Sequence, residues 1–180
     1  MSISEARLEA ALSRLEIQDV MMRYARGVDR ADEKMLKSCY HADAIEEHGS
    51  AYAGPAHAYI EGAVGRIRKM GAMAHYVCNI HIEFEGERDG VEVAYVEAYV
   101  LTFLRVAEDE GDWDTLTGGR VCDRFERRDG EWKIAHRKIV FDWNRDMPSN
   151  QGWCRGVLNP DDPKMVMATK GADDLSYLRF

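Results

Sequence analysis

A carboxylate and a histidine at the boundaries of two predicted elements are the side chains best suited to proton transfer. Asp29 follows the apolar end of the first predicted helix, and His75 opens the first long predicted strand. Histidine and carboxylate side chains are common general acids and bases. Each residue also has a purely structural explanation, Asp29 as a turn cap and His75 as a hydrogen-bonded residue at a strand start. The sequence alone leaves both explanations open.

Three further polar side chains are candidates for the same site. Glu46 and His48 share one face of a short extended segment, as either acid–base groups or a solvated edge. Tyr24 lies on the apolar stripe of the first helix, where core packing with a hydrogen-bonded hydroxyl is the usual role.

Other catalytic chemistries have no matching pattern. The sequence contains no G-x-S-x-G elbow, no P-loop and no dinucleotide-binding fingerprint. His75 and His81 would lie about 20 Å apart along one strand, too far to share a metal ion. Ligands contributed by several strands remain the alternative. We therefore expect proton transfer by a histidine and a carboxylate, with no cofactor and no metal.

Composition indicates one ordinary domain of 180 residues. The 24 basic and 32 acidic side chains give a formal net charge of −8, which argues against nucleic-acid binding. We expect no signal peptide and no membrane span, because no basic segment precedes an apolar one and no apolar run is long enough. The scattered cysteines predict reduced thiols in a cytoplasmic protein: Cys39, Cys78, Cys122 and Cys154.

The pattern of apolar residues changes from helical to alternating near residue 75. It predicts helices over 4–28, 33–40 and 55–70, with Asp32 as the N-cap of the second, and an extended segment over 44–48. Four strands are predicted after them, over 75–86, 91–107, 115–128 and 131–143. Helices followed by an antiparallel meander indicate an α+β domain with the helices on one face of a curved sheet.

Alternation along the strands assigns side chains to faces. It places Asn79 on the face of His75, and Arg137 with Phe141 and Trp143. Arg137 has apolar neighbours and therefore needs an anionic or carbonyl partner. The strand over 91–107 is apolar on both faces. This pattern indicates a subunit interface or, alternatively, a strand at the centre of the domain.

We divide the chain into a domain over 1–143 and an arm over 144–180. Gly and Pro interrupt the arm too often for a second core, yet it keeps many apolar residues. It is expected to cover the pocket or to clasp a neighbouring subunit.

Three segments resemble the nuclear transport factor 2-like superfamily and its SnoaL-like branch, which includes hexachlorocyclohexane dehydrochlorinase and scytalone dehydratase. They are EIQDVMMRYARGVDR over 16–30, HYVCNI over 75–80 and FERRDGEWKIAHRK over 125–138. The resemblance implies a cone-shaped α+β barrel, cystatin-like in form, with an apolar pocket between sheet and helices. For the homo-oligomer that the apolar strand indicates, the resemblance favours a trimer over a dimer.

The resemblance further implies a catalytic dyad of His75 and Asp29, in which the histidine removes a substrate proton. Arg137 would offset negative charge, and Tyr24 would donate a hydrogen bond. Glu46 stands where the dehydrochlorinase has a pocket tryptophan, which favours a hydroxylated substrate. The side chains expected to contact the substrate are Glu46, His48, Asn79, Phe141 and Trp143.

These observations predict a cofactor-independent lyase that acts on a small apolar, hydroxylated aromatic or cyclic substrate. Dehydration is the leading reaction, and release of formaldehyde by carbon–carbon cleavage would use the same base. The alternatives are an isomerase of the ketosteroid-isomerase type and a non-catalytic module that binds small molecules. A hydrogen bond between His75 and Asp29 at the floor of a closed pocket would favour an enzyme, whereas a pocket filled by side chains would favour a structural role.

Overall fold

The computed structural model describes residues 3–178. Its N-terminal helices are α1 (Glu5–Asp29), α2 (Glu33–Ser38) and α3 (Ala56–Ile67). The strands are β1 (Tyr40–Glu47), β2 (Ala53–Pro55), β3 (Met73–Arg88), β4 (Val91–Val106), β5 (Trp113–Arg128) and β6 (Glu131–Pro148). The C-terminal arm carries the short helices α4 (Trp153–Gly156), η1 (Gly171–Asp173) and α5 (Leu175–Leu178).

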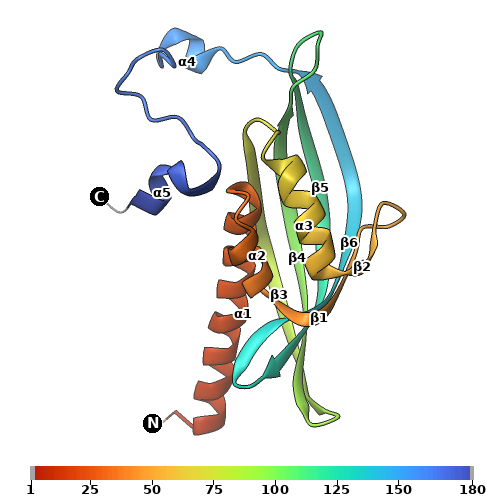
Figure 1. Cartoon of the computed structure of the whole chain (residues 1–180). Helices are drawn as coiled ribbons and strands as arrows, with labels where there is room; N and C mark the ends of the chain where they lie inside the picture. Colours follow the sequence, from red (N-terminus) through yellow and green to blue (C-terminus); the bar gives the residue numbers. More distant parts are fainter. Residues whose placement is uncertain (1–2, 179–180) are drawn as a thin grey trace.

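The strands form one curved sheet in the order β2-β1-β6-β5-β4-β3, and α1 and α3 lie on one side of it (Figure 1). Strands β3 to β6 make the predicted antiparallel meander, whereas β1 pairs in parallel with β6. The predicted α+β architecture is confirmed. The sheet stays open rather than closing into a barrel, with β2 and β3 at its two edges.

Only part of the apolar stripe of α1 enters the core. Ile17, Val20 and Met21 are fully buried, while Leu8 and Leu12 remain about half exposed. Packing therefore anchors the half of the helix that ends at Asp29. No helix among residues 3–178 is long and apolar enough to cross a membrane.

Irregularities in β3 and β6 overturn part of the predicted facing pattern. The pairing register shifts between Cys78 and His81, and Asn79 has a positive φ of 49°. In β6 the register shifts once at Ala135 and once at Asp142. Each β-bulge adds one residue and reverses the alternation beyond it. Asn79 is therefore exposed and does not share the face of His75, and Phe141 and Trp143 do not share a face.

The outer face of the sheet is partly apolar. Tyr76, Leu101, Gly118 and Trp143 lie opposite one another on adjacent strands. Tyr76, Tyr99 and Trp143 are each about half exposed, while Ala94, Val96 and Ala98 on the inner face of β4 are buried. One face of β4 thus belongs to the core and the other is open in the single chain.

The C-terminal arm returns to the end of α1. β6 runs to Pro148, beyond its predicted end at 143, and the chain then crosses to the helical layer (Figure 1). Asp174 forms an ion pair with Arg30 at 3.1 Å, and the Tyr177 hydroxyl donates to Asp32 at 2.8 Å. Asp32 also caps α2, as predicted, by accepting from the Met35 amide. The arm is fastened next to Asp29.

We expect Asp174→Asn combined with Tyr177→Phe to release the arm while the domain stays folded. The substitutions remove an ion pair and a hydrogen bond at its anchor. Limited proteolysis should then cut within residues 151–178 at least several times faster than in the wild type. Asp161→Asn, at an exposed position of the same arm, is the control. Equal cleavage rates in all three proteins would contradict this anchoring.

Candidate active site

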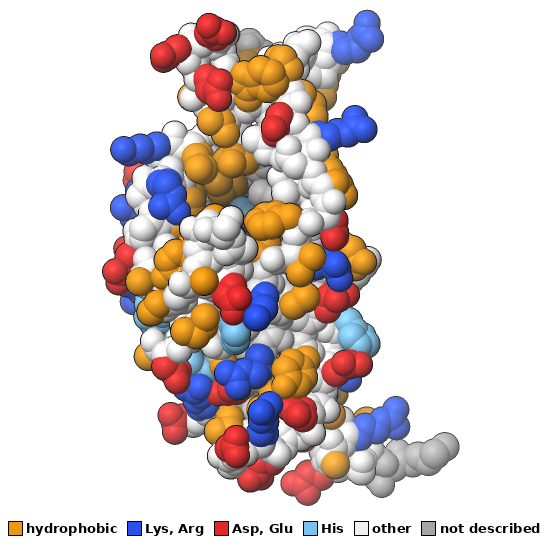
Figure 2. All heavy atoms as spheres, turned by 90° about the vertical axis from the view of Figure 1, so that its right-hand side faces the viewer, with side chains coloured by type: hydrophobic (Ala, Val, Ile, Leu, Met, Phe, Trp, Pro, Cys, Tyr) orange, Lys and Arg blue, Asp and Glu red, His pale blue; other side chains and the backbone are white. Residues whose placement is uncertain are grey.

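The concave face of the sheet and the helical layer enclose a cavity of about 230 Å³. Two cross-strand rows form part of its wall: Val77, Val100, Gly119 and Phe141 in one, and His75, Thr102 and Thr117 in the other. A second lobe, also of about 230 Å³, reaches towards α2 and α3 and shares Tyr24, His48, His75 and Thr102 with the first. Figure 2 shows that the molecular face containing β6 is hollowed and that hydrophobic side chains surround the hollow.

His75 and Asp29 are hydrogen-bonded at the edge of this cavity. The ring Nδ1 lies 2.7 Å from one Asp29 oxygen, and the His75 main-chain N–H donates to the other at 3.1 Å. An ionised carboxylate only accepts hydrogen bonds, so Nδ1 carries the proton and Nε2 keeps a lone pair. Both side chains are largely buried, with 16% and 14% exposure. The carboxylate therefore fixes both the tautomer and the orientation of the ring.

Asp29 occupies an unfavourable position for a carboxylate. It is the last residue of α1, where the helix dipole favours positive charge. Its two bonds to His75 compensate for this, and the ammonium of Lys170 in the arm lies 3.4 Å from its carbonyl oxygen. Local preferences alone would not select Asp at this position.

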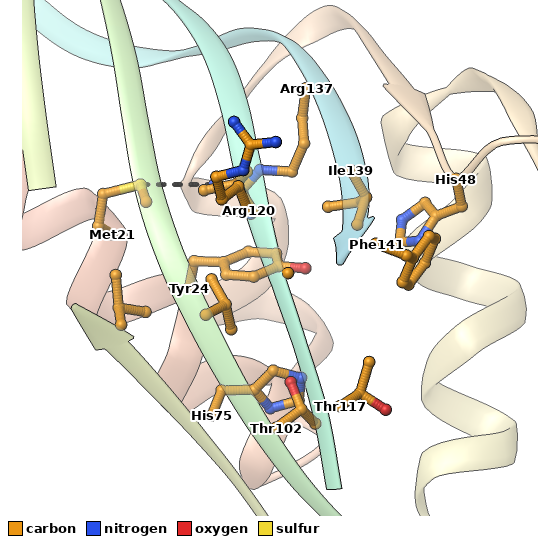
Figure 3. A pocket seen from close by; sticks show the side chains of 14 residues that line it. Met21, Tyr24, His48, His75, Thr102, Thr117, Arg120, Arg137, Ile139 and Phe141 are labelled. Carbon is orange, nitrogen blue, oxygen red and sulfur yellow. Dashed lines mark hydrogen bonds between the residues drawn. The ribbon is translucent and has the colours of Figure 1, made fainter. Parts of the chain in front are cut away.

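Arg137 is fully buried and paired. Its Nε and Nη2 donate to the two oxygens of Asp123 at 2.8 and 2.6 Å, and Nη2 also approaches the Met21 sulfur (Figure 3). The ring of Tyr24 stacks on the guanidinium at 4.0 Å. The expected anionic partner is thus Asp123, and most of the arginine's charge is neutralised within the protein.

Tyr24 lines both lobes of the cavity with a neutral hydroxyl. Desolvation inside the domain raises the pKa of Tyr24 far above its ordinary value, against the opposing effect of Arg137. A phenol that keeps its proton can donate a hydrogen bond to a developing oxyanion.

A second histidine–carboxylate pair adjoins the cavity. His48 lies directly after β1, and its Nε2 is 2.8 Å from Glu46 Oε1. Glu46 is 1% exposed, and its other oxygen has no hydrogen-bond partner among the described residues. The His48 ring stacks on Tyr59 at 4.3 Å. Burial raises the pKa of Tyr59 to about 12, and the Glu46 charge adds to the rise.

The structure brings most of the predicted site residues together. His75, Tyr24, Arg137, His48 and Phe141 line the first lobe (Figure 3). Asp29 and Glu46 bond to the two histidines. Two predicted substrate contacts, Asn79 and Trp143, lie outside the lining, because each is separated from the cavity-facing row by a bulge.

Sequence reasoning missed Asp123, the partner of Arg137. The sequence does contain a sign of this residue. Asp123 lies two residues from the apolar Val121 and two from Phe125, so all three share the buried inner face of β5. A carboxylate at such a position requires a hydrogen-bonding or cationic partner.

We expect Asp123→Asn to lower the free energy of unfolding by about 3–5 kcal/mol, because it leaves a buried guanidinium without its counterion. Urea titration measures the change. Asp19→Asn, which breaks an exposed ion pair with Arg23, should cost no more than about 0.5 kcal/mol. The double replacement Asp123→Leu with Arg137→Met should restore part of the loss. A cost for Asp123→Asn as small as that of the exposed control would contradict this role.

Comparison with known proteins agrees with this architecture. Residues 9–138 match the model of the SnoaL-like domain family. No curated protein sequence matches the chain. A provisional scytalone dehydratase from Novosphingobium aromaticivorans superposes with a TM-score of 0.67 at 19% identity, over 78% of this chain and 91% of that one. A hexachlorocyclohexane dehydrochlorinase, LinA-type3 from Novosphingobium barchaimii, gives 0.64 at 24% identity, over 78% and 93%.

A protein with a cystatin-like fold from Nostoc punctiforme is also similar, with a TM-score of 0.56 at 18% identity, over 79% of this chain and 96% of that one. At these identities the solved structures support the fold alone. The family match spans most of the domain, including both histidine–carboxylate pairs and Arg137. The chain therefore belongs to the SnoaL-like domain family.

Proposed function

We propose that the protein is a cofactor-independent lyase that eliminates water from a small, hydroxylated cyclic or aromatic substrate. The observation that carries this proposal is the 2.7 Å hydrogen bond between His75 Nδ1 and Asp29, beside an open, mostly apolar cavity. The reaction class is supported by proteins of related fold that are named as a dehydrochlorinase and, provisionally, as a scytalone dehydratase.

His75 would act as the base. Its Nε2 takes a proton from a substrate carbon while Asp29 stabilises the imidazolium that forms. Where the carbon is next to a carbonyl group, the electron pair moves towards that oxygen, and the Tyr24 hydroxyl supplies a hydrogen bond to it. Arg137 packs against the Tyr24 ring and does not bind the substrate charge. Its Nε and Nη2 groups already donate to the two oxygens of Asp123.

The cavity favours a neutral substrate of one or two rings. A cavity of roughly 150 Å³ with apolar walls holds one benzene molecule. One lobe of about 230 Å³ therefore suits a single substituted ring, and both lobes together suit two. Release of formaldehyde from a hydroxymethyl-bearing ring would use the same base and pocket.

An isomerase is the second candidate, and the burial of Glu46 favours it. Such an enzyme needs two acidic donors at one oxyanion, and Tyr24 with a protonated Glu46 is the available pair. The hydrogen bond of Glu46 to His48 favours the lyase, because it assigns this carboxylate to an imidazole.

We expect His75→Gln to lower kcat about 10²–10⁴-fold without changing the thermal unfolding midpoint by more than a few degrees, because only the proton acceptor is lost. Asp29→Asn should lower kcat at least about 100-fold. The assay follows enone absorbance from 3-hydroxycyclohexanone and related cyclic β-hydroxyketones. His81→Gln, on the exposed face of β3, is the control. A His75→Gln protein with near-normal kcat would exclude this residue as the base.

We also propose that the exposed outer face of the sheet pairs with another copy to form a dimer or trimer. Tyr76, Tyr99 and Trp143 on that face would be buried by association. Sedimentation velocity at micromolar concentration should therefore show an oligomer, and Tyr99→Asp should shift it towards monomer. A monomeric wild type would contradict the proposal. A change in mass on deleting residues 151–180 would instead identify the arm as the clasp.

A further inference from the structure

The two histidine–carboxylate pairs contribute their rings to one cavity but come from strands that lie far apart in the sheet. His75 is carried by the edge strand β3, whereas His48 follows β1, four strands away in the sheet order. Curvature of the sheet brings both rings into the lining of both lobes. Figure 3 shows the rings of His48 and His75 on different sides of the cavity.

Two contacts hold the His48 ring, and a third holds its main chain. Glu46 bonds to Nε2 at 2.8 Å, and Tyr59 stacks on the ring at 4.3 Å. The main-chain N–H of His48 donates to the Tyr52 carbonyl at 2.8 Å, which closes the turn between β1 and β2. Since Nε2 is occupied, Nδ1 is the nitrogen that remains for a ligand.

The burial of Glu46 is energetically unfavourable. A buried carboxylate oxygen without a partner opposes folding, and side chains that break packing rules in this way concentrate at functional sites. Glu46 is 1% exposed and lies near the phenols of Tyr24 and Tyr59, whose pKa values its charge helps to raise. A protonated His48 is the partner that would best offset this cost, because it places a positive charge 2.8 Å away.

We infer that His48 is the general acid that protonates the departing hydroxyl group, and that Glu46 is its positioning residue. The inference rests on the proposed elimination. The C–H bond breaks and its proton passes to His75 Nε2, while its electron pair moves onto the adjacent carbonyl oxygen to give an enolate. The pair then returns to form the new C=C bond as the C–O bond breaks with its own pair on oxygen, and that oxygen takes the Nδ1 proton of His48 and leaves as water. Solvent returns His75 and His48 to their starting protonation states.

The test separates substrates by their need for an acid. 3-Hydroxycyclohexanone and 3-acetoxycyclohexanone both give cyclohexenone, but hydroxide leaves poorly without a proton whereas acetate is a stable anion. We expect His48→Gln to lower kcat for the hydroxyketone at least about 100-fold and for the acetoxyketone less than about threefold. Glu46→Gln should show the same selectivity with a smaller loss, and His75→Gln should lower both rates. His81→Gln should change neither.

Each outcome decides the matter. The ratio of the two rates is measured on the same sample, so partial unfolding of a variant does not alter it. An equal loss for both ketones in His48→Gln, or no loss for either, would overturn the role of His48 and leave His75 as the base. A wild-type protein that converts neither ketone would overturn the proposed elimination itself, and with it this inference.

Discussion

The buried Arg137–Asp123 pair is the interaction around which the interior of the sheet is organised. A guanidinium does not lose its charge in a protein, so an arginine with 0% exposure requires a carboxylate and polarisable neighbours. Asp123 lies directly opposite on β5, and Tyr24 comes from α1. Tyr40 of β1 completes the cluster with a longer contact of 3.4 Å. One charge therefore ties together the helix and the strands that form the cavity wall.

The same cluster explains why the cavity is apolar and yet able to handle protons. Arg137 is neutralised inside the wall, and burial keeps the Tyr24 hydroxyl protonated, so neither places a net charge in the cavity. The titratable groups of the two histidine–carboxylate pairs enter from the ends of elements, at the last residue of α1 and just after β1. Asp29, Glu46 and His75 thus lie in α1, β1 and β3, His48 follows β1 directly, and an apolar surface lies between the two pairs. Such preorganisation places hydrogen-bond donors where charge develops, next to mostly apolar walls.

Bulges decide which side chains belong to the cavity. The bulge near Asn79 adds one residue to β3. His75 and Val77 before the bulge, and Ile80 and Ile82 after it, therefore all lie on the concave face. The extra residue at Asp142 separates Phe141, in the cavity lining, from Trp143 on the outer face. At that bulge Gly118 and Gly119 leave room for the Trp143 ring and the Val140 carbonyl, where a Cβ would collide. The bulges thus set the boundary between the cavity and the apolar outer surface.

Periodicity, capping and breaker residues in the sequence determine the helices, the meander and the order of elements, because these depend on contacts between near neighbours in the chain. Asp32 as a cap and the need of Arg137 for an anion follow from such local chemistry. The parallel pairing of β1 with β6, the bulges and the return of the arm to α1 depend on contacts between distant segments. Only the tertiary structure therefore decides that Asp29 meets His75, that Asp123 holds Arg137, and that His48 faces the same cavity. The bulge at Ala135 sets the register that places Asp123 opposite Arg137, whereas curvature of the whole sheet brings His75 and His48 to one cavity.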